Sequence, residues 1–221
     1  MAIARVAAGG TAGNASGGNL ACTITAATAG SVLFAALYRE AQTWTLPAGW
    51  TQIGSDQRDY SNQMYLTVAW YLATGGETSF TFNLSGTTWR TVVIDEFSGV
   101  HTTSPVNVGP TGRGTNEATD GTHGAIASSI TTTVANTLLV ACIGSYTGTD
   151  ATANATGYSA GNQLGGMEIW YAAQAAAGAS GDKTFGSYSG SDQGNWATHH
   201  LALQEPTAGA TVKRLLLMGV G

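Results

Sequence analysis

Carboxylate pairs are the first candidates for chemistry in this sequence. Glycoside hydrolases place two carboxyl groups about 5 to 9.5 Å apart across a cleft. Asp95 and Glu96 are adjacent on an expected strand, so their side chains point to opposite faces and do not form such a pair. Four other glutamates show no catalytic spacing and are interpreted as solvated surface acids: Glu40, Glu77, Glu117 and Glu168. The sequence predicts no catalytic residue and therefore no enzyme.

The histidines offer no recognisable metal site. His199 and His200 are neighbours on an expected strand, which predicts one core histidine beside an exposed one. His101 and His123 lie in an expected linker. A zinc site needs spacings such as His-x-x-x-His or Cys-x-x-Cys, and neither occurs. Calcium loops, nucleophile elbows and glycine-rich nucleotide loops are also missing from the sequence, so we expect no metal and no cofactor.

Aromatic residues in one long expected loop are the remaining candidates for ligand binding. Trp44, Trp50 and Tyr60 lie in this loop, where they would form a platform on which a sugar stacks. The alternative is that Trp50, which follows Pro47 and Gly49, covers the open end of the hydrophobic core. The three aromatic residues are therefore candidate glycan contacts, with core covering as the competing role of Trp50.

The elements that would position these residues occur twice. Residues 20–38, LACTITAATAGSVLFAALY, align without a gap with residues 126–144, IASSITTTVANTLLVACIG. Residues 61–74 reappear as residues 161–174, and a third match follows in the same order. Three matches in register order indicate an internal duplication. The matched aromatic residues are Trp70 with Trp170, Tyr71 with Tyr171, and Trp89 with Trp196.

About ten short apolar or alternating segments, separated by turn residues, predict an all-β protein. We expect a single antiparallel β-sandwich or jelly roll in which two five-strand repeats share one interior, with extended arms at both ends. The expected divisions are an N-terminal arm at 1–18, a first repeat at 19–99, a linker at 100–124, a second repeat at 125–205 and a C-terminal arm at 206–221.

The second match contains one inconsistency. It pairs Val68 with Glu168, which would place a carboxylate on a core face, whereas Met167, Ile169 and Tyr171 have the pattern of a buried set. A shift of one residue exchanges the two faces of a strand. We therefore expect a bulge or an insertion near residues 165–166.

Composition excludes several classes of partner. The formal net charge is −5 and only 10% of the residues are charged, with arginines scattered along the chain. No basic stripe is available to displace counterions from nucleic acid. No segment approaches the roughly 20 apolar residues of a membrane span.

Cys22 and Cys142 fall in expected strands and are predicted to be buried free thiols. The first residues do not resemble a signal peptide, so we expect synthesis in a cytoplasm.

The end of the sequence does not fit the duplicated plan. A basic pair precedes an apolar run that has no counterpart in either repeat. Left exposed, such a run would promote aggregation, so we expect it to dock on this sandwich or, as we favour, on the sheet edge of a neighbouring chain. The residues of this expected assembly arm are Lys213, Arg214, Leu215, Leu216, Leu217, Met218 and Val220.

Several short motifs resemble those of a known group of proteins. PAGWT with Ile53 at residues 47–53, AWY at 69–71 and EFSGV at 96–100, followed by a weaker second copy, resemble the duplicated β-sandwich structural proteins of tailed-bacteriophage virions. The ending KRLLLMGVG is similar to the C-terminal ends of virion components. This resemblance implies a role in head decoration or as a tail or baseplate accessory, and it brings no catalytic residue with it.

The first functional hypothesis is a non-enzymatic virion protein, made in the host cytoplasm. It would be a capsid decoration or cement protein that attaches through its terminal arms to neighbouring subunits, either the major capsid or a tail protein, and forms a homo-oligomer. The alternative is a carbohydrate-binding module of a phage tail or fibre that uses the Trp44 and Trp50 loop. A third hypothesis, a polysaccharide-degrading jelly roll, requires a carboxylate pair that the sequence does not offer.

Overall fold

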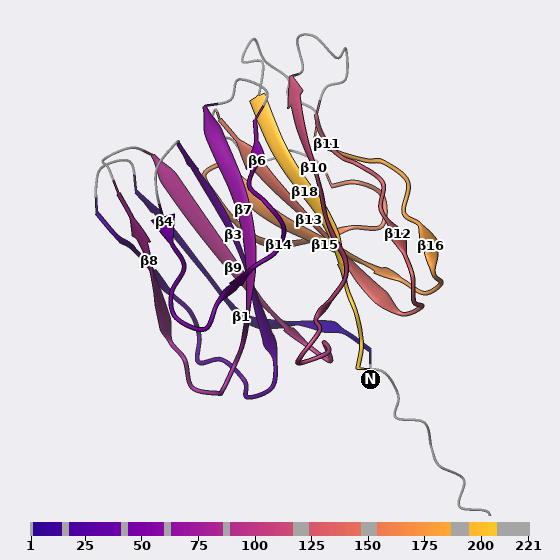
Figure 1. The fold of residues 1–221 in the computed structure, drawn as a ribbon, viewed down its shortest axis with the longest axis horizontal. Helices are drawn as coiled ribbons and strands as arrows, with labels where there is room; N and C mark the ends of the chain where they lie inside the picture. Colours follow the sequence, from indigo (N-terminus) through magenta and orange to yellow (C-terminus); the bar gives the residue numbers. More distant parts are fainter. Residues whose placement is uncertain are drawn as a thin grey trace, which may run out of the picture.

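The computed structural model shows an all-β protein made of antiparallel sheets, as the sequence predicts (Figure 1). It contains eighteen strands within the residues that it describes. No helix occurs in these residues. The described ranges are 2–14, 18–40, 44–59, 63–85, 89–116, 124–146, 154–186 and 195–206.

The first repeat forms a six-stranded sheet with the order β1-β9-β3-β7-β5, and β6 also pairs with β7. The central strand β3 is buried on both faces along eight of its nine residues, as expected for a continuous apolar run. The strands of this sheet are β1 (Ala4–Asn14), β3 (Val32–Glu40), β5 (Thr51–Gln52), β6 (Gln57–Arg58), β7 (Met64–Leu72) and β9 (Arg90–Ser98).

The second repeat forms a five-stranded sheet with the order β10-β18-β13-β15-β14. Each of its strands is equivalent to a strand of the first sheet, so the two copies share the same strand topology. The strands of this sheet are β10 (Val106–Asn116), β13 (Thr137–Ser145), β14 (Ser159–Leu164), β15 (Met167–Gln174) and β18 (Asn195–Leu203).

Short strands back each large sheet and give each repeat an interior of its own. In the first repeat, Leu20 and Phe82 of the short strands pack with Leu33 of the large sheet. In the second, Phe185 packs with Leu139. The short sheets are β2 (Leu20–Thr23), β8 (Ser79–Leu84) and β4 (Trp44–Thr45); β11 (Ala125–Ala127) and β17 (Lys183–Phe185); and β12 (Thr131–Thr132) and β16 (Gly178–Ala179).

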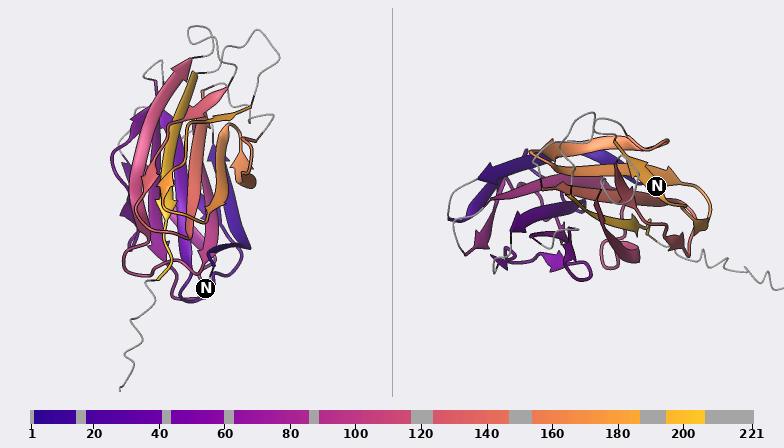
Figure 2. Two further views of the ribbon diagram at one scale, coloured as in Figure 1. Left: turned by 90° about the vertical axis from the view of Figure 1, so that its right-hand side faces the viewer. Right: turned by 90° about the horizontal axis from the view of Figure 1, so that it is seen from above.

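A third apolar cluster joins the two large sheets. Phe34 and Leu66 of the first sheet pack in this cluster with Val140 and Ile169 of the second. The contacts between the two large sheets are reciprocal. The outer strand β1 contacts β14, and its counterpart β10 contacts β6. In the same way β9 contacts β15, and its counterpart β18 contacts β7. The same surface of each copy therefore meets its counterpart, as in a two-fold symmetric dimer. Figure 2 shows the two halves of the chain stacked in layers.

Two segments expected to lie outside the sheets are strands instead. Residues 1–18 were expected to form an arm, but Ala4–Asn14 pairs with β9, and in the expected linker Val106–Asn116 pairs with β18. The Gly and Ala content that suggested flexibility serves close packing here. A Cβ atom on Gly9 would collide with the Asn162 side chain, and one on Gly10 would collide with the Thr23 carbonyl.

The register of the two repeats differs by one residue from the expected alignment. Ala35 lies opposite Ala69, and its equivalent Ala141 lies opposite Trp170. Trp170 is therefore the counterpart of Ala69, and the pairing of Trp70 with Trp170 is wrong. Trp70 packs against the shared cluster, whereas Trp170 packs in the interior of the second repeat.

The pairing of Trp89 with Trp196 is wrong for the same reason. Arg39 lies opposite Arg90, and Ser145, which aligns with Arg39, lies opposite Trp196. Trp196 is therefore the counterpart of Arg90. The expected bulge or insertion near residues 165–166 is seen instead as a register shift between Ala160 and Gln163 of β14, whereas Gly165 and Gly166 form the turn to β15 with positive φ, 52° and 78°. Such a turn lets the copies differ in length without changing the strands on either side.

Candidate functional site

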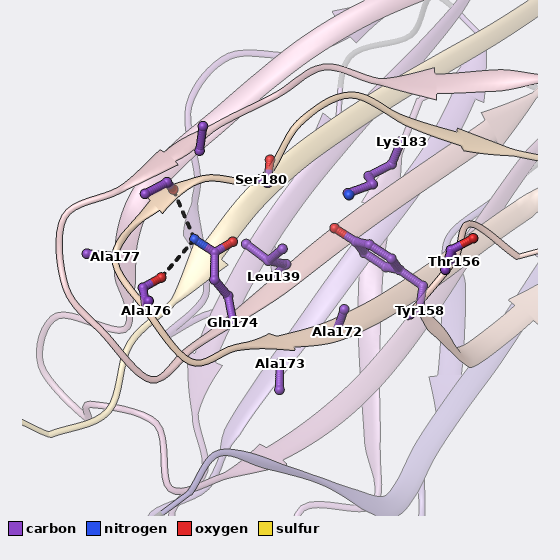
Figure 3. A pocket seen from close by; sticks show the side chains of 13 residues that line it. Leu139, Thr156, Tyr158, Ala172, Ala173, Gln174, Ala176, Ala177, Ser180 and Lys183 are labelled. Carbon is purple, nitrogen blue, oxygen red and sulfur yellow. Dashed lines mark hydrogen bonds between the residues drawn. The ribbon is translucent and has the colours of Figure 1, made fainter.

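The candidate site is an open cavity of about 390 Å³ on the second repeat (Figure 3). Leu139 of β13 and Ala172 of β15 form its apolar floor. Tyr158 and Lys183 lie along one wall, and Gln174 lies on the opposite wall, close to β16 (Figure 3). The volume falls within the range of about 300 to 1,000 Å³ that is typical of small-molecule sites.

A glycine turn places Tyr158 in the cavity wall. Gly157 has a φ of 87°, which favours glycine, and the Tyr158 amide donates a hydrogen bond of 3.0 Å to the Ala155 carbonyl. The Asn154 side-chain amide donates one of 2.7 Å to the Tyr158 carbonyl. These bonds fix the backbone on both sides of the tyrosine.

A buried histidine fixes the role of the Tyr158 hydroxyl. His200 Nδ1 lies 2.8 Å from the Ser128 carbonyl, which can only accept, so Nδ1 carries the proton. Burial lowers the pKa of His200, and the nearby Lys183 charge lowers it too, while the Ser128 carbonyl opposes the shift. The neutral ring therefore accepts at Nε2, and the Tyr158 hydroxyl donates to it across 2.7 Å. The Tyr158 oxygen keeps a free lone pair, and burial raises the pKa of this hydroxyl.

Gln174 presents its oxygen to the cavity, because its nitrogen is already bound. Its Nε2 atom donates to Thr132 Oγ1 at 2.8 Å, to the Gly178 carbonyl at 2.9 Å and to the Ala176 carbonyl at 3.1 Å. The side-chain oxygen turns toward Leu139 and the cavity floor (Figure 3). The site thus offers a second hydrogen-bond acceptor opposite Tyr158.

Sequence reasoning did not select this site. The match of Gly157-Tyr158 with Gly49-Trp50 was visible, but the one-residue error in register hid the equivalence of Ala172 and Tyr71. With the correct register, the loss of a large side chain at position 172 marks where the cavity lies.

The buried carboxylates form structural contacts and not an acid–base pair. Asp95 and Glu96 face opposite sides of β9, as expected. Asp95 Oδ1 accepts a hydrogen bond of 2.8 Å from Arg5 Nε, and Glu96 Oε1 accepts one of 2.6 Å from the Ser31 hydroxyl. Burial raises the pKa of Asp95, although Arg5 opposes this effect.

Glu168 is not the solvated surface acid that the sequence suggested. It is fully buried, and its Oε2 atom accepts a hydrogen bond of 2.6 Å from Trp170 Nε1. The one-residue shift accounts for this position, because it turns Glu168 away from the cluster shared by the two sheets and toward the interior of its own repeat.

The histidine pair also departs from expectation, because both side chains are buried. His199 is 3% exposed and His200 is 0% exposed. His199 lies on β18 between the large sheets, and burial lowers its pKa to about 4. Both faces of β18 are covered, one by the other large sheet and one by the short strands, so neither neighbour reaches solvent.

The aromatic residues proposed as glycan contacts do not form one exposed platform. Trp50 is 7% exposed and stacks on Tyr71 with ring centroids 5.6 Å apart, inside the core of the first repeat. Trp44 is half-buried, with the Arg39 guanidinium 5.3 Å from its ring. Tyr60 lies outside the described residues. Trp50 is therefore positioned to cover the core.

The expected assembly arm also lies outside the described residues, which end at Pro206. Both cysteines are free and buried, as expected. In the ranges that the structure describes, no three His, Cys, Asp or Glu side chains come close enough to hold a metal ion. The same ranges contain no helix of the length and apolar character that a membrane crossing requires.

Comparison with known proteins assigns no family to this chain. No protein-family model matches it, and neither the curated proteins nor the solved structures include a significant match.

Proposed function

We propose that this chain is a non-enzymatic structural protein of a tailed-bacteriophage virion, where it decorates or cements the capsid. Its partners would be further copies of itself and a neighbouring major capsid or tail protein. The virion-like motifs at residues 47–53, 69–71 and 96–100 support this assignment. The description of the stacked sheets as one jelly-roll-like sandwich is part of the same proposal.

The observation that carries the proposal is an apolar cavity beside the point where the described chain ends. This cavity of about 370 Å³ is lined mainly by apolar side chains, among them Ile3, Leu138 and Ala175, and its polar lining residues are Asn136, Thr137, Gln174 and Glu205. The apolar run Leu215–Val220 follows in the sequence and has no place in the duplicated plan. We propose that this run from one copy packs into the cavity of a neighbouring subunit, where each buried leucine contributes about 1.5 to 3 kcal/mol.

The sheet edges offer further room for such an attachment. Within the described chain, β1 pairs only with β9 and β10 pairs only with β18. Each is an eleven-residue outer strand. Long outer strands with unpaired backbone groups accept an added strand readily. Because β1 is built into the sheet, the attachment is assigned to residues 206–221 and not to a free N-terminal arm.

Deletion of residues 207–221 tests the proposal. The deletion should lower incorporation into particles by more than about tenfold, since the loss of even one buried leucine contact exceeds the roughly 1.4 kcal/mol that corresponds to a factor of ten. The melting temperature should stay unchanged. A variant with a polar Gly/Ser segment of equal length controls for chain length. Normal occupancy by either variant would rule out attachment through this segment.

A matched pair of substitutions separates the cavity from general surface effects. Ala175→Trp fills the cavity beside the chain end, whereas Ala177→Trp fills only the cavity at Tyr158. Both alanines are exposed in the same turn region, so the two variants carry a similar surface change. We expect reduced incorporation for Ala175→Trp alone.

The second candidate function is carbohydrate-mediated host attachment through the Trp44 loop. It is favoured by a shallow cavity of about 290 Å³ that Trp44 lines together with Asn83 and Ser85. Trp44→Ala should abolish cell or glycan binding if this function holds. Unchanged binding would remove the candidate.

A further inference from the structure

The two repeats differ most clearly at the candidate cavity. In the first repeat, four aromatic rings fill the corresponding space. Trp50 stacks on Tyr71 at 5.6 Å with an interplanar angle of 30°, and it meets the edge of Phe80 at 5.1 Å. Phe82 lies 5.7 Å from the same indole. This space is therefore filled by protein.

Strand pairing identifies two of the corresponding residues in the second repeat. Leu33 lies opposite Tyr71, and its equivalent Leu139 lies opposite Ala172. Gly49 and Gly157 have nearly the same positive φ, 85° and 87°, and each precedes an aromatic residue of the cluster. Tyr158 thus takes the place of Trp50, and Ala172 takes that of Tyr71.

The short strands β8 and β17 also differ in the side chains on their inner faces. Phe82 of β8 and Phe185 of β17 each pack in the interior of their own repeat. Two positions earlier, and so on the same face of each strand, stand Phe80 and Lys183. The second repeat therefore has Ala172 in the place of Tyr71 and Lys183 on the inner face of β17, and both residues line the cavity of about 390 Å³. The Trp170 ring packs beside Phe185, with ring centroids 5.6 Å apart.

The groups around this cavity define the chemistry of an occupant. The Tyr158 oxygen and the Gln174 oxygen are left as acceptors, because their donor groups are bound to protein. Lys183 supplies a cationic donor on the Tyr158 side (Figure 3). Among the described residues no carboxylate forms a salt bridge with Lys183. The neighbouring Asp182 accepts a 2.7 Å hydrogen bond from the Ser129 amide.

We propose that this cavity binds a hydroxylated ring that carries a carboxylate, such as a uronic acid residue of an acidic glycan. The ring hydroxyls donate to the Tyr158 and Gln174 oxygens, and the carboxylate pairs with the Lys183 ammonium. The apolar C–H face of the ring lies on Leu139 and Ala172. The inference is independent of the virion role and of the Trp44 loop.

A nuclear magnetic resonance titration with sodium glucuronate, with glucose as the neutral counterpart, tests the inference. We expect saturable shifts at the Gln174 side-chain amide and at Gly178, with a dissociation constant of about 1 mM, and about tenfold weaker binding of glucose. Shifts that are absent up to about 50 mM, or equal affinities for the two sugars, would overturn the proposal.

Substitutions locate the binding and its charge dependence. Lys183→Met should remove the preference for glucuronate, whereas Arg113→Met, a half-buried cation on β10, should leave it unchanged. Ala177→Trp should abolish binding of both sugars, and Ala175→Trp should not. Retained selectivity in Lys183→Met refutes the assigned contact, and this result stands even if the tryptophan variants fold poorly.

Discussion

His199 makes the stability of this protein depend on pH in a defined direction. The side chain is 3% exposed between the two large sheets, and neither ring nitrogen has a well-formed hydrogen bond with the described residues. Burial lowers its pKa to about 4, while the Asp56 charge and the backbone of Leu66 and Ser55 oppose this effect only in part. The unfolded chain has a histidine pKa of about 6.5.

The sign and the size of the effect follow from this difference. Because the pKa of His199 is lower in the folded protein than in the unfolded chain, neutral His199 makes its full contribution to the free energy of unfolding above pH 6.5. It is lost as the pH falls through the folded pKa, because the unfolded chain binds the proton first. The difference of about 2.5 pKa units corresponds to a loss of about 3 kcal/mol by pH 4.

His199→Leu removes the titrating group and keeps a similar volume in an apolar cluster. At pH 7 we expect the variant to be more stable by about 1 to 3 kcal/mol, since it removes a buried polar group that lacks hydrogen bonds. Urea unfolding followed by tryptophan fluorescence at pH 7, 5.5 and 4 measures both quantities. The wild type should lose about 3 kcal/mol more than the variant between pH 7 and pH 4.

The half-buried His101 provides a control. His101→Asn removes a histidine elsewhere in the fold but preserves an acceptor for the Thr103 and Ser104 amides, and at pH 7 it should be as stable as the wild type. Parallel pH curves for the wild type and His199→Leu would refute the reasoning. They would show that protonated His199 is accommodated between the sheets without cost.

Three further substitutions test individual contacts. Trp50→Ala should destabilise the protein by about 3 to 5 kcal/mol, as measured by urea unfolding; a loss below about 1 kcal/mol would contradict the assigned role of Trp50 in covering the core. Arg5→Met leaves the Asp95 carboxylate buried without its cation and should cost about 3 kcal/mol at pH 7, and an unchanged urea midpoint would contradict this. Burial alone would raise the pKa of Glu77, but hydrogen bonds from Thr74 and nearby backbone amides lower it to about 2. Glu77→Gln should therefore have a lower free energy of unfolding than the wild type above about pH 4.3, and this difference should disappear by about pH 2. A difference that does not depend on pH would exclude this cause.

The duplication made the plan of the fold predictable. Ile24 and Ile130 align in sequence, and each is buried in the interior of its own repeat. The apolar run of β3 likewise marks a central strand covered on both faces. These features are local and periodic, so one sequence suffices to detect them.

Other features depend on contacts between distant segments and were not predicted. The Gly- and Ala-rich β1 has the composition of a flexible arm, and only the neighbouring Asn162 and Thr23 show why glycine is required there. The register error arose because tryptophans at 70 and 170 were matched by type, whereas pairing across the sheet aligns Ala69 with Trp170. The cavity lies beside Ala172, and only the strand pairing identifies Tyr71 as the counterpart of this alanine.

The most direct test of the proposed virion role is imaging of phage particles purified from a lysate in which this chain is made. Cryo-electron microscopy should resolve the two stacked large sheets at a fixed position on the particle, with density that continues past Pro206 into a neighbouring subunit. Particles that lack the chain, although infected cells contain it, would contradict the proposal.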